Sequence, residues 1–146
     1  MGSDSLSDFF RPALVITGLF TIIGAALLLR PFGDGPSGHG AGFAIIILYL
    51  ALWGGFVLSA TGLAMPPGNG YSAGFTGTQR RLFALAAVAG ALGAVVPVVG
   101  FPVLFSHPQL YVYGFYVAVG IGPVLLVVGL GWRGIQVLRS HTAEGL

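Results

Sequence analysis

The chain has 146 residues, of which 55% are hydrophobic and only 7% are charged, and its mean hydropathy is +0.93. About a quarter of the residues of an ordinary soluble domain are charged, so this composition predicts one membrane-embedded domain over residues 1–146. The net charge of +2 comes from scattered arginines without any lysine, which is not the pattern of a nucleic-acid-binding protein. Since the chain contains no cysteine, disulfides, thiolate metal sites and thiol redox chemistry are excluded.

Four apolar segments follow one another, separated by stretches rich in glycine and proline. A helix needs about 20 residues to cross a hydrocarbon layer about 30 Å thick. Pro12 suits the first turn of the first helix, and the Pro-Pro-Gly sequence at residues 66–68 ends the second. The uncharged stretch between Arg81 and Arg133 is long enough for two crossings. The sequence therefore predicts an all-α bundle of four transmembrane helices, at about residues 12–29, 41–65, 82–105 and 110–132.

The arginines indicate how this bundle is oriented. With four crossings, the N-terminus, the central connector and the C-terminus share one side of the membrane. That side carries Arg11, Arg80, Arg81, Arg133 and Arg139, whereas the other carries only Arg30. Because positive residues concentrate on the cytoplasmic side of membrane proteins, we expect a cell-membrane protein with both termini in the cytoplasm.

Small residues recur at helical spacing in the third and fourth segments. In lipid, small residues let helix backbones approach closely, which favours helix association. We expect two helix-packing rows, one of Ala86, Gly90 and Gly93 and one of Gly114, Ala118 and Gly122. The alternative is that these helices are rich in glycine without forming a particular seam, because the chain has 25 glycines in all.

Ionisable groups are absent from the predicted spans, although ion-coupled carriers and pumps need them there to bind and move charge. None of the four carboxylates is positioned to pair with another as acid and base. They are Asp4, Asp8, Asp34 and Glu144. The sequence therefore predicts neither a catalytic site nor an enzyme.

Two histidines are the best candidates for a cofactor site. His39 precedes the second predicted helix and His107 lies in the turn before the fourth, so both should reach the same membrane face. Two imidazoles at one interface could ligate a haem iron or hydrogen-bond a quinone, with Tyr49 and Tyr116 lining the pocket. The competing interpretation is ordinary loop and turn chemistry, since His39 is flanked by glycine and His107 precedes a proline.

These observations favour a non-enzymatic membrane protein that binds no cofactor and serves as an accessory or oligomerising subunit. Its partners would be the lipid bilayer and other membrane subunits or further copies of the chain, and no nucleic acid. One alternative is a haem- or quinone-binding redox protein that uses His39 and His107. Another is a small-solute transporter or channel, in which prolines such as Pro97 and Pro123 break helices around a cavity.

Overall fold

A computed structural model describes residues 3–29, 39–66, 75–100 and 106–144, and within those ranges the chain is helical and has no strand. The helices are α1 (Ser3–Leu29), α2 (His39–Ala64), α3 (Gly77–Val99) and α5 (Pro108–Glu144). Each contains an apolar segment long enough to cross a membrane. These segments are Phe9–Leu29, Phe43–Ala64, Gly77–Val99 and Pro108–Ser140. The prediction of four helices that are long and apolar enough to span a membrane is confirmed for the described residues.

The boundaries of the helices differ from the predicted ones. Helix α1 begins at Ser3, so Pro12 lies inside the helix and not in its first turn. Helix α3 begins at Gly77, several residues before the predicted start, and ends at Val99. Residues 101–105, which were expected to complete this span, lie outside the described residues. Three of the apolar segments, Phe9–Leu29, Gly77–Val99 and Pro108–Ser140, include arginines near one end. The expectation that the membrane-embedded parts contain no ionisable group stays a prediction.

Helix α3 starts early because Thr76 caps it. Its side chain accepts a hydrogen bond from the backbone N–H of Gln79 (3.3 Å), and the Gln79 side chain accepts one from the backbone N–H of Thr76 (3.0 Å). This reciprocal capping box satisfies amide groups that are otherwise unpaired at a helix N-terminus. The two arginines that were expected to precede the helix, Arg80 and Arg81, therefore belong to it.

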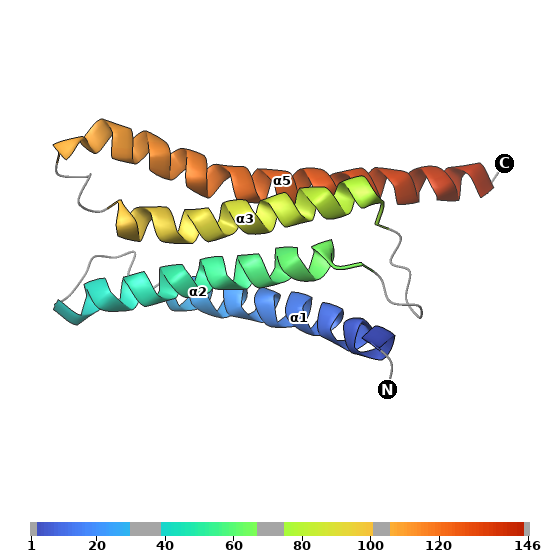
Figure 1. The fold of residues 1–146 in the computed structure, drawn as a ribbon, viewed down its shortest axis with the longest axis horizontal. Coiled ribbons are helices and arrows are strands. Elements are labelled where there is room, and N and C mark those ends of the chain that lie inside the picture. Colours follow the sequence, from blue (N-terminus) through green and yellow to red (C-terminus); the bar gives the residue numbers. More distant parts are fainter. Residues whose placement is uncertain (1–2, 30–38, 67–74, 101–105, 145–146) are drawn as a thin grey trace.

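The helices pack in chain order as an open row (Figure 1). Helix α2 packs against α1 and α3, and α3 packs against α2 and α5, so α1 and α5 form the two outer helices of the row. The N-terminus, the start of α3 and the C-terminal part of α5 lie at one end of the molecule (Figure 1). Helix α5 has 37 residues, about 55 Å at 1.5 Å per residue, and extends beyond the start of α3.

Helices α1 and α2 approach each other closely at two facing glycines. A Cβ atom on Gly18 would lie 2.5 Å from the carbonyl oxygen of Gly55, and one on Gly55 would lie 2.7 Å from the carbonyl oxygen of Gly18. Beside this contact, the Ser59 hydroxyl donates to the Val15 carbonyl at 3.5 Å, the long limit for a hydrogen bond. Backbone packs directly on backbone at this point, which only glycine permits.

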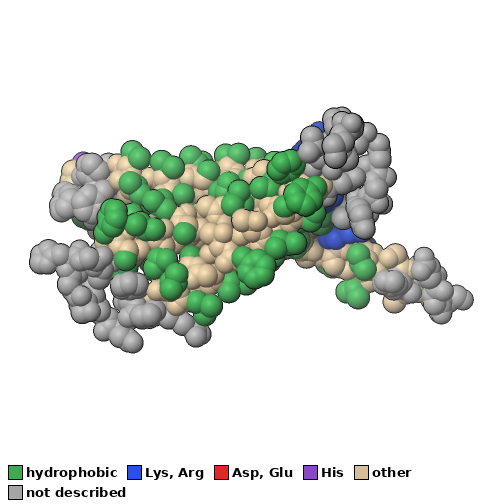
Figure 2. Space-filling model, turned by 90° about the horizontal axis from the view of Figure 1, so that it is seen from below, with side chains coloured by type: hydrophobic (Ala, Val, Ile, Leu, Met, Phe, Trp, Pro, Cys, Tyr) green, Lys and Arg blue, Asp and Glu red, His purple; other side chains and the backbone are tan. Residues whose placement is uncertain are grey.

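Few side chains are buried, and the large apolar ones mostly face outward. The buried apolar residues are Ala25, Trp53, Ala60, Phe83 and Ala86. Hydrophobic side chains cover much of the face drawn in Figure 2, and the arginines gather toward one end. A surface of this kind is unfavourable in water but suits a hydrocarbon environment. The core is thus confined to the seams between neighbouring helices.

Candidate functional site at the arginine-bearing end

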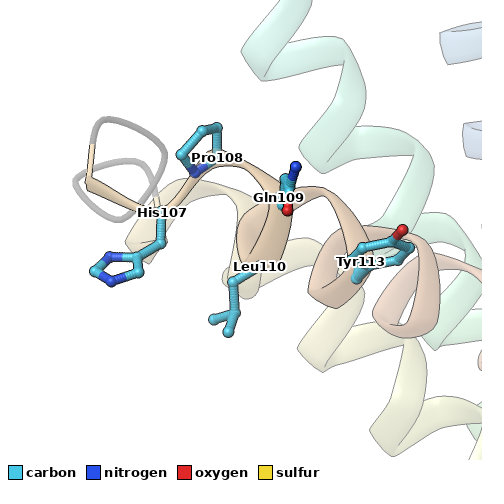
Figure 3. A pocket seen from close by; sticks show the side chains of 5 residues that line it. All are labelled: His107, Pro108, Gln109, Leu110 and Tyr113. Carbon is cyan, nitrogen blue, oxygen red and sulfur yellow. The ribbon is translucent and has the colours of Figure 1, made fainter.

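The predicted histidine site lies at the opposite end from the arginines. Helices α2 and α5 begin at this end (Figure 1), at His39 and Pro108, so the chain brings the two histidine positions to one end of the row. The imidazole of His107 is exposed and points away from the helices (Figure 3). Beside it lies a shallow hollow of about 450 Å³ lined by His107, Pro108, Gln109, Leu110 and Tyr113. The side chain of His39 is not among those described.

The two tyrosines of that predicted site face different surroundings. The Tyr49 hydroxyl donates a hydrogen bond of 2.6 Å to the Gly93 carbonyl, and so it links α2 to α3. Tyr116 on α5 is 68% exposed. Among the described residues, no group of three or more potential metal ligands occurs. A haem or quinone site formed by these four residues therefore stays a prediction.

The predicted small-residue row of α3 lies where α3 packs against the neighbouring helices. Ala86, Gly90 and Gly93 are all buried. A Cβ on Gly90 would lie 2.5 Å from Cδ1 of Phe56 in α2, and one on Gly122 of α5 would lie 3.3 Å from the Gly90 nitrogen. These positions adjoin both neighbours of α3.

The predicted row of α5 is divided between different environments. Gly122 is buried against Phe56 of α2 and the backbone of α3, whereas Gly114 is exposed and has no described neighbour within 4 Å of the position that its Cβ would take. The side chain of Ala118 is not among those described. The two small-residue rows therefore do not meet along their whole length.

A polar cluster at the arginine-bearing end was not anticipated from the sequence. Gln79 is fully buried, and its Nε2 donates to Oε1 of Gln136 on α5 at 3.1 Å. Its Oε1 accepts from Thr76, as described above. A buried amide is expensive unless its donors and acceptors are bonded, and here one side chain joins the cap of α3 to α5. The spacing of Thr76 and Gln79 is typical of a capping box and could have indicated this part of the cluster. No sequence pattern indicates that Gln136 is the partner of Gln79.

Aromatic rings fill the space beside this cluster. Phe83 is fully buried and meets Phe75 edge to face, with ring centroids 5.2 Å apart. A Cβ on Gly129 of α5 would lie 2.6 Å from Cε1 of Phe83, so the ring occupies the volume that a side chain would take. Phe83 therefore packs α5 against the first turns of α3.

Two arginines from different helices lie near each other at this end of the molecule. The Arg11 guanidinium of α1 lies over the Phe75 ring, with Cζ 5.5 Å from the centroid. Arg80 of α3 lies within electrostatic range of Arg11, and its buried Nε has no hydrogen-bond partner. Neither arginine forms an ion pair with another described side chain. The carboxylate side chains of the chain are not among those described. The site is thus a partly buried pair of like charges on an aromatic support.

Comparison of the chain with protein-family models, with characterised proteins and with solved structures finds no match. The fold itself defines the class: a small α-helical protein with four helices that are long and apolar enough to be embedded in a membrane.

Proposed function

We propose that the protein is an integral protein of the cell membrane, with both termini in the cytoplasm, and that it serves as an accessory or oligomerising subunit of a larger membrane assembly. The observation that carries this proposal is a hollow of about 420 Å³ on the outer helix α5. It is lined by Tyr116, Val117, Gly120, Ile121, Val124 and Leu125.

The chemistry of this hollow suits a second transmembrane helix. Val117 is 59% exposed and Val124 is 61% exposed, while Gly120 between them has no described neighbour within 4 Å of its Cβ position. Lipid tails are as apolar as these side chains, so burial alone does not drive helices together in a membrane. Close van der Waals packing drives helices together in lipid, and a glycine between larger residues lets a neighbouring backbone approach.

The polar groups of the spans support a packing role more than a substrate role. The Thr21 hydroxyl donates to the Thr17 carbonyl at 2.8 Å, within one helix. The hydroxyls of Tyr49 and Ser59 donate to carbonyls of neighbouring helices. Hydroxyls engaged in this way join or stiffen helices.

The test is the mass of the particle that the protein forms when it is extracted from its native membrane in a mild detergent. We expect a defined oligomer or a stable complex with other membrane subunits, measured by native mass spectrometry. Gly120→Leu fills the hollow and should shift the protein to the monomer. Gly54→Leu is the matched control, because Gly54 is exposed on α2 and also has no described neighbour within 4 Å. A monomeric wild-type protein would contradict the proposal, as would an equal effect of both variants.

A further inference from the structure

Arg11 and Arg80 bring two positive charges near each other at the arginine-bearing end. The two cations come from α1 and α3, which are far apart in the sequence, and neither has an ion-pair partner among the described side chains. The Nε of Arg80 is buried and lacks a hydrogen-bond acceptor. A buried donor on a charged group loses its water without recovering a partner, which is unfavourable.

The start of α3 adds to this excess of positive charge. The N-terminus of a helix carries a partial positive charge, and acidic residues there are favourable whereas basic ones are not. The first turn of α3 contains no acidic residue, yet Arg80 and Arg81 follow directly after the cap. An anion bound at this point would therefore interact favourably with the helix as well as with the arginines.

We infer that Arg11 and Arg80 together bind a phosphate group at the arginine-bearing end of the bundle. A guanidinium offers parallel N–H donors that match the oxygens of a phosphate. Cζ of Arg11 lies 5.5 Å from the ring centroid of Phe75, which directly precedes the N-cap residue Thr76, so this guanidinium is held beside the start of α3. The phosphate can belong to a lipid headgroup, because this site lies at the ends of the spans, or it can be free inorganic phosphate.

The two sources are separated by two measurements on the wild-type protein in a neutral detergent. In the first, native mass spectrometry compares retention of phosphatidylglycerol with that of phosphatidylcholine. In the second, the Tm is compared in sodium phosphate and in sodium chloride of equal ionic strength. Retention of the anionic lipid assigns the site to a headgroup, and a higher Tm in phosphate assigns it to the free anion. If neither effect is seen, the inference is wrong.

Variants locate the binding. We expect Arg11→Gln and Arg80→Gln each to weaken binding about tenfold or more, since each removes half of the site. Arg81→Gln is the matched control, because Arg81 is the exposed neighbour of Arg80 and the change in charge is identical. It should weaken binding by less than about twofold. An equal loss in the control would show that only the general positive charge matters, and would overturn the inference.

Arg80→Lys is a milder variant that is less prone to unfold the protein, because it retains the charge but lacks the planar guanidinium and its parallel N–H donors. We expect this variant to keep the helical circular dichroism spectrum and the elution volume of the wild-type protein, and to bind phosphate several-fold more weakly. Binding equal to that of the wild-type protein would overturn the role of the Arg80 guanidinium.

Discussion

Gln79 of α3 and Gln136 of α5 form a hydrogen bond of 3.1 Å between their side-chain amides. Gln79 is fully buried, and its carbonyl oxygen is engaged at the same time by the backbone of Thr76. A single side chain therefore holds the start of α3 in place and joins it to α5. Interactions of this kind specify which helices are neighbours, which apolar packing alone does less well in lipid.

Removing the partner of Gln79 should destabilise the fold. Gln136→Leu leaves the Nε2 of Gln79 buried without an acceptor, and we expect a loss of about 1–3 kcal/mol in the free energy of unfolding. Gln109→Leu is the control, because Gln109 is exposed at the other end of α5, and it should change stability by less than about 0.5 kcal/mol. Unfolding in mixed detergent micelles, followed by circular dichroism, measures both. Equal stability of the two variants would contradict the role of the amide pair.

The contact between Gly18 and Gly55 predicts that a glycine-to-alanine substitution has opposite effects on stability at two positions. Gly18→Ala places a methyl group against the backbone of α2, and we expect a loss of about 1–3 kcal/mol from overpacking. Gly54→Ala adds the same group at an exposed position of α2 and should stabilise the helix by about 0.5–1 kcal/mol. The same unfolding assay compares them. A neutral Gly18→Ala variant would mean that α1 and α2 are not in such close contact.

Tyr49 and Tyr116 offer a second matched pair. Tyr49→Phe removes only the hydroxyl that donates to the Gly93 carbonyl, and we expect a loss of about 0.5–1.5 kcal/mol. Tyr116→Phe removes the same atom from a side chain that is 68% exposed, so its effect should be close to zero. If the Tyr116 variant were the less stable of the two, the proposed link between α2 and α3 would be wrong.

The cysteine-free sequence makes the proposed orientation easy to test. Ser106→Cys precedes α5, and Ser140→Cys lies near its C-terminal end, at the opposite end of the molecule. In intact cells, a membrane-impermeant thiol reagent should label the first variant, whereas the second should be labelled only after the cells are permeabilised. The reverse pattern would place the arginine-bearing end outside the cell.

The number and approximate position of the helices could be predicted because length and apolar composition determine whether a segment can span a membrane. The ends of the helices were less predictable. Thr76 and Gln79 carry a capping-box spacing that marks the start of α3, but the apolar run alone placed that start after Arg81. Pro12 was assigned to a first turn because proline is tolerated there, although α1 continues on both sides of it.

The sequence did not predict which residues of different helices contact each other. Whether Gly18 or its neighbour Thr17 faces α2 depends on the rotation of both helices, and a chain with 25 glycines offers many equivalent seams. The same holds for the approach of Arg11 to Arg80 and for the pairing of Gln79 with Gln136. These contacts join residues that are distant in the chain, and no local pattern encodes such pairs.

The open row of helices has a consequence for the size of any assembly. In a closed ring, every helix has two neighbours, so no edge is left for a further subunit to bind. Here the two margins are formed by different helices: α5 carries a hollow over Gly120 among exposed apolar side chains, and α1 carries exposed apolar side chains such as Phe20, which is 72% exposed. Unlike margins can join head to tail, and such contacts close into rings or continue as open arrays according to the angle at each joint. The number of copies in such an assembly is then set by the angle between neighbouring copies and not by the packing inside each bundle.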